Sequence, residues 1–351
     1  MDSCSWMPSS CYIKILCMER IGVVDRLSFW KEEALPKRRG ATVNPSHRRQ
    51  MKMRTGGEVV HSYNRQCVGN IVFCSDIDRL VFFTMFCTYA KKLDIKILGL
   101  SIMLNHVHNL TRPAAKKQLS MFMDMVLSTF SRQFNKDRGR HGSVWHPRFG
   151  RAVKHDDKDV RQSIIYLADN QMEKKHCKRV RETRWNFMAY AKRRHPFSKK
   201  LSMTKMSPCL HDAVRAVDFE YDLGNYLNYS TLRRIFKGLV PAETQQLIDY
   251  IIVKYNVIDY QEAGKYFGGV EMMLKAMNRT IAHEYDIKEL MDGPDDRPYF
   301  KMISSFGEAE TAKFLVLSVE KKIEIAEMIL KKALAPKYHI CRLLWLDEAF
   351  S

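Results

Sequence analysis

From residue 59 to residue 174 the chain alternates between two kinds of apolar spacing, and this order limits its possible folds more than any other feature. Three segments have apolar residues at helical spacing, and four shorter segments are typical of strands. The expected strands are Val59–Gln66, Ile95–Leu104, His106–Thr111 and Val144–Lys154, and the expected helices are Asp76–Leu93, Lys116–Asp137 and one from Asp157 or Asp159 to Lys174. The order strand, helix, strand, strand, helix, strand predicts an α+β fold, a ferredoxin-like βαββαβ unit with helices on one face of the sheet and the other face open.

Basic residues outnumber acidic ones, with 58 Lys and Arg against 39 Asp and Glu, which gives a formal net charge of +19. An excess of this size favours a polyanionic partner, most simply nucleic acid, over a merely solvated basic surface. The nine cysteines form no Cys-x-x-Cys pair, so the sequence predicts neither a zinc ribbon nor a disulfide framework, and a reducing cytoplasm fits. No apolar run approaches the roughly 20 residues that span a bilayer, so we expect no membrane partner.

Two histidines stand two residues apart in the third expected strand. Side chains two apart on a strand project from the same face, so His106 and His108 are expected side by side. Two neutral imidazoles are an incomplete metal site, which needs a third ligand and open positions for a substrate. On the last expected helix, Tyr166 and Asn170 are four residues apart and share a face. The carbonyl oxygen of Asn170 completes a set that suits Mg²⁺ or Mn²⁺, and the phenol of Tyr166 is then placed to attack a phosphate polarised by the metal.

Basic and aromatic residues near these positions are candidates for holding DNA. Arg148 and Arg151 lie around Phe149 on the last expected strand and could line a groove together, and Trp145 could stack on a base. A basic run directly follows the tyrosine helix, which favours contacts with phosphates. The remaining candidates are Lys174, Lys175, Lys178 and Arg179 in that run and Arg65 at the end of the first strand. The alternatives are core packing for Trp145 and a solvated surface for the cations.

Asn105-His106-Val107-His108 resembles the HUH motif (histidine, hydrophobic, histidine) of the single-tyrosine HUH transposases. The resemblance is closest to the branch called REP-associated tyrosine transposases, which are IS200-like. Four further segments match in the same order: Val60–Arg65, Val144–Phe149, Tyr166–Asn170 and Trp185–Tyr190. A His-x-His motif alone is weak, whereas these pieces in order over residues 57–195 are a strong indication.

The resemblance implies that Tyr166 attacks a phosphate of single-stranded DNA, often folded as a hairpin, and leaves a 5′-phosphotyrosine and a free 3′ hydroxyl. It also implies Mg²⁺ or Mn²⁺ on two histidines and an amide, and a bacterial cytoplasmic protein. Three positions depart from the family: Leu104 stands where Pro is usual, Asn109 where an apolar residue is common, and Gln171-Met172 where Pro-Val is usual. Because Gln171 adds a second amide, either Asn170 or Gln171 could face the metal, and the spacing favours Asn170.

The expected organisation has three parts. Residues 1–55 are a flexible basic arm that need not be native, because Met51 or Met53 would serve as a start. Residues 56–195 are the HUH domain, and residues 196–351 are an all-α domain. The prediction is therefore a catalytic α+β domain followed by helices that help to select or grip DNA.

The last two expected helices, residues 320–333 and 337–346, are joined by a tight junction at Ala335-Pro336 and resemble a helix-turn-helix. A helical hairpin that only packs is the alternative. If the second helix binds DNA, we expect Lys337, His339 and Arg342 to face outward.

The function expected from these features is a DNA transposase that cuts and rejoins single-stranded or hairpin DNA, as a monomer or a homodimer. One alternative is a non-catalytic nucleic-acid-binding regulator that keeps the HUH fold, although intact His106, His108 and Tyr166 argue against it. A second alternative is a metal-dependent hydrolase, which would use water and leave no covalent adduct.

Overall fold

The computed structural model of the chain describes residues 57–66, 70–173, 176–202, 204, 206–279 and 296–346. The arm expected at residues 1–55 lies outside the described residues. Contacts divide the chain into two compact units: the described residues up to Arg297 belong to one, and those from Pro298 onward belong to the other.

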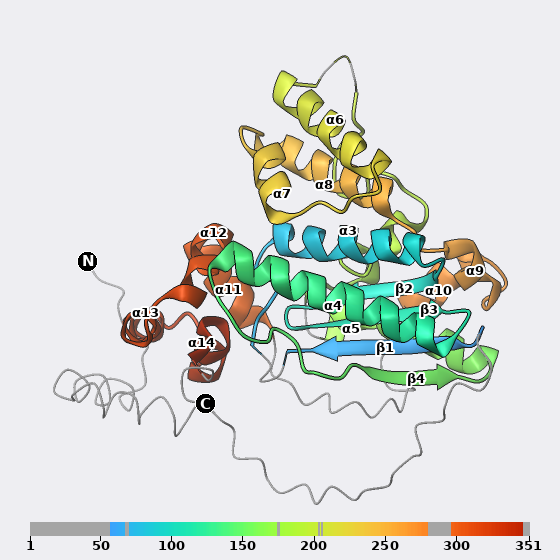
Figure 1. The fold of residues 1–351 in the computed structure, drawn as a ribbon, viewed down its shortest axis with the longest axis horizontal. Helices are drawn as coiled ribbons and strands as arrows, with labels where there is room; N and C mark the ends of the chain where they lie inside the picture. Colours follow the sequence, from blue (N-terminus) through green and yellow to red (C-terminus); the bar gives the residue numbers. More distant parts are fainter. Residues whose placement is uncertain are drawn as a thin grey trace, which may run out of the picture. The chain divides into compact units, whose positions relative to one another are not determined.

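A four-stranded antiparallel sheet forms the middle of the first unit (Figure 1). Its strands are β1 (Val59–Arg65), β2 (Lys96–Ile102), β3 (His106–Arg112) and β4 (Gly150–Lys154), in the spatial order β2-β3-β1-β4. The three helices that alternate with them are α3 (Asp76–Lys92), α4 (Lys116–Arg138) and α5 (Asp157–Glu173). β1 pairs with both β3 and β4, so β1 and β3 are central. This arrangement confirms the predicted α+β, ferredoxin-like βαββαβ fold.

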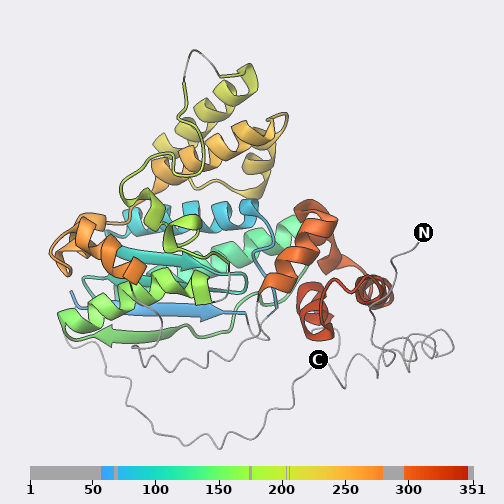
Figure 2. The ribbon, with the colours of Figure 1, turned by 180° about the vertical axis from the view of Figure 1, so that it is seen from behind.

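Helices cover both faces of the sheet rather than one. On one face, the amide of Asn109 in β3 contacts the sulfur of Met123 in α4. Leu110 lies on the opposite face, where it belongs to the same buried cluster as Tyr166 of α5. Figure 1 shows α4 in front of the strands, and Figure 2, from behind, shows α5 in front of them. The expectation that one face stays open is wrong, because α5 packs on that face through its apolar residues.

The expected strand Val144–Lys154 forms only from Gly150 onward. Pro147 has no N–H to offer a strand partner. Upstream of it, Trp145 turns inward and is only 4% exposed. Its indole packs among three phenylalanines with ring centroids 5.7 to 6.2 Å away, Phe73, Phe82 and Phe130. This aromatic cluster holds residues 144 and 145 in the core, so the segment cannot run along the sheet edge.

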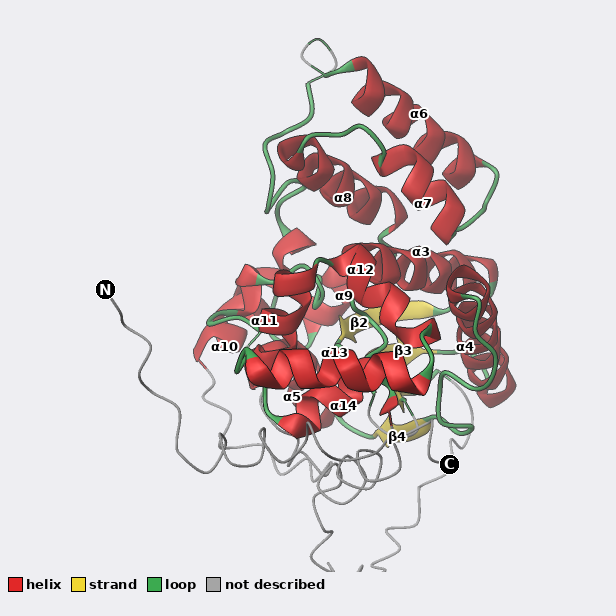
Figure 3. Ribbon diagram, turned by 90° about the vertical axis from the view of Figure 1, so that its left-hand side faces the viewer, coloured by secondary structure: helices red, strands yellow, loops and turns green. Residues whose placement is uncertain are grey.

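Helices that follow residue 196 also belong to the first unit. They are α6 (Pro208–Asp222), α7 (Tyr229–Phe236), α8 (Pro241–Tyr255), α9 (Tyr260–Lys265) and α10 (Val270–Arg279). Figure 3 shows α6, α7 and α8 as an all-helical layer, and α7 and α8 contact α3. The N–H of Asp259, which caps α9, donates to the carbonyl of Ile97 in β2 over 2.8 Å. The domain boundary expected at residue 196 stays a prediction.

The second unit is helical throughout its described residues, as expected for the C-terminal part. It contains α12 (Glu308–Lys313), α13 (Val319–Lys331), α14 (Lys337–Leu344) and most of α11 (Arg297–Phe306). His339 and Arg342 of α14 are only 5% and 6% exposed, and the ring of His339 lies 4.7 Å from that of Tyr299. The expectation that His339 and Arg342 face outward is therefore wrong, because α14 packs them inside this unit.

No helix among the described residues is both long enough and apolar enough to cross a membrane.

Candidate active site

Three residues of β1 share a sheet face with the two predicted histidines of β3. The strand register places Tyr63 opposite His108 and Arg65 opposite His106, and His61 lies two residues before Tyr63. The ring centroids of His106 and His108 are 4.9 Å apart, as their spacing predicts. The sequence analysis missed His61 and Tyr63. Their spacing of two residues in the first expected strand could have indicated them. The predicted fold places that strand beside β3, so one of its faces continues the face of the two histidines.

Helix α5 brings the predicted nucleophile onto these rings. The carboxylate of Asp156 accepts a hydrogen bond from the N–H of Asp159 over 2.7 Å and so caps the start of the helix. Tyr166 is 6% exposed, and its ring centroid lies 5.5 Å from that of His108 and 5.8 Å from that of His61. The structure therefore groups Tyr166 with one predicted ligand, His108, and with a histidine that was not predicted.

The two amides at the end of α5 have different surroundings. Nε2 of Gln171 donates to the carbonyl of Ile102 over 2.8 Å, and its Oε1 lies 2.7 Å from Nδ1 of His176. Both ends of this amide are thus occupied by bonds that tie α5 to neighbouring segments. Asn170 is 1% exposed, one helical turn beyond Tyr166, and its Nδ2 has no hydrogen-bond partner in the structure. The hydrogen bonds of Gln171 thus distinguish it from Asn170, and a metal-ligand role for the Asn170 oxygen stays a prediction.

Both predicted metal ligands have a neighbouring side chain close to Nδ1 of the ring. Nδ1 of His106 lies 2.6 Å from Oδ1 of Asn105, and Nδ1 of His108 lies 3.1 Å from Nε2 of His61. Each ring therefore has its Nδ1 facing a neighbouring side chain, and a metal-ligand role for His106 and His108 stays a prediction. Among the described residues, no group of three His, Cys, Asp or Glu side chains is placed to hold a metal ion.

Burial keeps two of these imidazoles uncharged. Desolvation lowers the pKa of His108 to about 3. The pKa of His61 also falls well below its usual value, first through desolvation and then through repulsion by His108 and Lys154. Neutral imidazole is the form that binds metals, so the electrostatics of the site agree with a ligand role for His108.

The predicted basic residues around the sheet do not share one surface. Arg65 and Arg148 are exposed, and Arg148 lies in the loop before β4 rather than on a strand. Arg151 pairs with Ser62, which places it on the face opposite the histidines. The prediction that Arg148 and Arg151 line one groove is thus wrong in geometry, since the strand starts between them. Lys154, which the sequence analysis missed, pairs with Val59 and lies on the histidine face.

The basic run after α5 is described only in part. Lys174 and Lys175 lie outside the described residues. Lys178 and Arg179 are exposed, and the backbone N–H groups of both donate to the carboxylate of Glu182. A role for these cations in binding DNA stays a prediction. Trp145, buried in its aromatic cluster, occupies the packing position that was its alternative.

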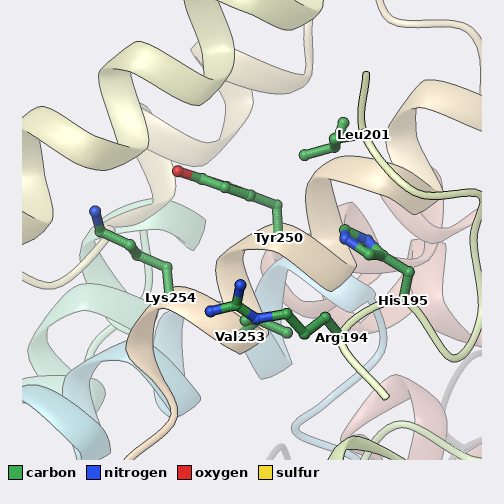
Figure 4. Close-up of a pocket in the computed structure, with 6 residues that line it drawn as sticks. All are labelled: Arg194, His195, Leu201, Tyr250, Val253 and Lys254. Carbon is green, nitrogen blue, oxygen red and sulfur yellow. The ribbon is translucent and has the colours of Figure 1, made fainter. Parts of the chain in front are cut away.

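A separate pocket of about 420 Å³ lies between α8 and the segment before α6 (Figure 4). Its lining residues are Arg194, His195, Leu201, Tyr250, Val253 and Lys254. The ammonium of Lys254 lies 2.8 Å from the carboxylate of Asp218, which also accepts a hydrogen bond from the hydroxyl of Tyr250. The pocket shares no residue with the histidine–tyrosine cluster.

Residues 70–169 match the family model described as "Transposase IS200 like". Over this segment the chain is similar to the IS200-like transposases. The matched segment contains His106, His108 and Tyr166, whereas His61 and Asn170 lie just outside it.

The chain is also similar to a solved structure of "the REP associates tyrosine transposase bound to a REP hairpin". The two share 14% identity with a TM-score of 0.34, over 38% of this chain and 79% of that one. No curated protein matches the chain.

Proposed function

We propose that this transposase domain cuts and rejoins single-stranded DNA, including hairpin DNA, by transesterification through Tyr166. The observation that carries the proposal is the ring contact of Tyr166 with His108, which lies beside His106 on the same strand. A phenol next to a pair of metal-ligating imidazoles is the arrangement that a metal-assisted attack on phosphate requires.

In the proposed reaction, the phenolic oxygen of Tyr166 forms a bond to the scissile phosphorus, and the bond from phosphorus to the 3′ oxygen breaks. The 5′ phosphate stays on the tyrosine, and the proton lost by the phenol is balanced by the one that the 3′ oxygen gains. A 3′ hydroxyl then reverses the step, so strands are rejoined without an external energy source. Arg65 and Lys154, which the strand register puts on the same face as the histidines, would hold the DNA phosphates.

His106, His108 and Asn170 would hold the metal ion, for which Mg²⁺ or Mn²⁺ suits the donor set. When bound, the ion would polarise the phosphate and lower the charge that builds up on it. The protein's own part is to keep His108 neutral by burial and to place the Tyr166 phenol against it.

A covalent-adduct gel tests the proposal. The full chain is mixed with Mn²⁺ and with labelled hairpin DNAs from beside its own gene, and the products are separated under denaturing conditions. Wild type should give a band of protein-bound DNA, and Tyr166→Phe should give none. Tyr63→Phe is the matched control and should keep the band, because Tyr63 is the other phenol on this face, with its ring 5.9 Å from that of His108.

Each other result has a definite meaning. Loss of the band in Tyr63→Phe, with the band kept in Tyr166→Phe, would assign the attack to Tyr63 instead. Cleavage without an adduct in wild type would indicate a hydrolase that uses water. Tight binding of all hairpins with neither cleavage nor adduct would support a non-catalytic regulator.

A further inference from the structure

The pocket between α8 and the segment before α6 has no part in the reaction proposed above. Hydrogen bonds join its two walls. The carboxylate of Asp249 in α8 accepts one from the N–H of Phe197 over 3.1 Å. Nε2 of Gln246, also in α8, donates to the carbonyl of Lys199 over 3.0 Å. The volume of about 420 Å³ lies within the range of roughly 300 to 1,000 Å³ that is usual for ligand sites, so the pocket has room for a group such as a nucleobase.

The lining of the pocket combines two rings with two aliphatic side chains. His195 supplies one ring from the segment before α6, and Tyr250 supplies the other from α8. Figure 4 shows the two rings apart, on different walls, and Leu201 and Val253 are the aliphatic side chains. Nδ1 of His195 is buried and has no hydrogen-bond partner among the described residues. A buried polar atom of this kind normally has a partner, so the pocket suits a flat ligand that carries polar atoms at its edge.

Two cations complete the lining, and their surroundings differ. The ammonium of Lys254 lies 2.8 Å from the carboxylate of Asp218 and 4.0 Å from that of Asp222, so its charge is compensated. Arg194 is exposed, and no carboxylate among the described residues lies within ion-pair distance of its guanidinium. The sequence around it adds positive charge, since residues 183–211 contain Lys and Arg but no Asp or Glu. Arg194 is therefore the cation of the pocket that can bind an anionic group.

We propose that this pocket binds one nucleotide of single-stranded DNA, with the base among the side chains of His195 and Tyr250 and a neighbouring phosphate on the guanidinium of Arg194. Proteins that bind single strands combine cations along the backbone with aromatic side chains against the bases. The edge of a base carries donors and acceptors, so it offers Nδ1 of His195 a partner in either tautomer. The choice of DNA as the ligand rests on the proposed function, whereas binding at this pocket does not depend on whether Tyr166 cuts the strand.

Photocross-linking tests where the base lies. The full chain is mixed, without divalent metal, with mixed-sequence single-stranded DNA that carries 5-iodouracil for thymine or 8-azidoadenine for adenine, and the cross-linked peptides are identified by mass spectrometry. We expect cross-links to His195 or Tyr250 in wild type and in Arg193→Ala, and a several-fold lower yield in Arg194→Ala. Arg193→Ala is the matched control, because Arg193 is also exposed but does not line the pocket. Wild type that gives no cross-link at either wall would overturn the proposal.

Fluorescence anisotropy with the unmodified DNA, at several salt concentrations, separates base contacts from charge. We expect His195→Ala to raise Kd about 5-fold or more and to leave the slope of log Kd against log salt unchanged. Arg194→Ala should raise Kd and also reduce that slope by about 0.7, the contribution of one phosphate contact to a single strand. Equal effects of Arg193→Ala and Arg194→Ala would indicate surface charge alone and would overturn the proposal, even if His195→Ala failed to fold.

Two further comparisons identify the ligand and separate this proposal from the proposed function. Free deoxynucleoside monophosphates should compete for the cross-link much more weakly than unlabelled DNA at equal nucleotide concentration, and equal competition would overturn the choice of DNA. A cross-link at the pocket without a covalent adduct in the gel would refute the attack by Tyr166 but uphold the pocket. An adduct without the cross-link would refute the pocket alone.

Discussion

His108 and His61 are imidazoles that the fold keeps uncharged at a pH where an exposed histidine is partly protonated. Desolvation between the sheet and α5 is the main cause of both lowered pKa values. The sign of the resulting pH dependence follows from proton counting. Below the pKa of an unfolded histidine, about 6.5, the unfolded chain binds protons that the folded chain refuses, so stability falls as the pH falls.

Between pH 7 and pH 5 we expect the neutral state of His108 alone to reduce the free energy of unfolding by about 2 kcal/mol, with His61 adding in the same direction. Urea unfolding at the two pH values measures this loss. His61→Gln should show a smaller pH-dependent loss, because it removes one of the two groups. His155→Gln, at an exposed position, is the control for the substitution itself, and an equal pH dependence in all three proteins would contradict the prediction.

Among the structural elements, β4 passes very close to a ring of the site. The ring of Tyr63 on β1 lies directly over Gly150 on β4, where a Cβ would collide with it. The glycine thus lets the tyrosine lie flat across the neighbouring strand, beside His61 and His108. This is a requirement for close approach rather than for an unusual backbone angle.

We expect Gly150→Ala to lower the free energy of unfolding by about 1 to 3 kcal/mol, the usual cost of overpacking. The same substitution made together with Tyr63→Ala should cost much less, since the ring that it strikes is gone. Denaturant unfolding of the two single variants and the double variant forms a double-mutant cycle. An undiminished cost in the Tyr63→Ala background would mean that Gly150 is needed for some other reason.

The sequence predicted those parts of the site that depend on local spacing. Residues two apart on a strand share a face, which pairs His106 with His108. Residues four apart on a helix also share a face, which pairs Tyr166 with Asn170. Both pairs could therefore be recognised from the sequence. The contact of His61 with His108 joins residues 47 positions apart and depends on the register of two strands, which no local pattern specifies. The burial of Trp145 and the sheet face on which Arg151 lies both depend on the residue at which β4 begins. No local pattern specifies that residue either.

In the first unit of the molecule, one buried carboxylate joins helix α8 to residues 184–198. Asp249 of α8 is fully buried and accepts four hydrogen bonds. The donors are Nε of Arg184, the hydroxyl of Tyr190, the N–H of Phe197 and the hydroxyl of Ser198, at 2.7 to 3.1 Å. Burial and this carboxylate both raise the pKa of Tyr190, which keeps its hydroxyl a donor.

We expect Asp249→Asn to lower the free energy of unfolding by about 3 kcal/mol, because it removes the charge that compensates the mostly buried Arg184 and replaces an acceptor by a donor. Chemical denaturation of the full chain measures the change. Asp212→Asn is the matched control at a carboxylate that is 80% exposed, and it should change stability by no more than about 0.5 kcal/mol. A loss equal to that of the control would show that Arg184 and Tyr190 find other partners.

The small exposure of Tyr166 also bears on the fate of a covalent intermediate. A phosphotyrosine formed at Tyr166, between α5 and the sheet, would have few water molecules near its phosphorus, since this residue is only 6% exposed. Hydrolysis of the phosphotyrosine would therefore compete poorly with attack by the hydroxyl of a bound DNA strand. In the proposed reaction, this exclusion of water would preserve the energy of the broken phosphodiester bond until a second DNA hydroxyl attacked the phosphotyrosine.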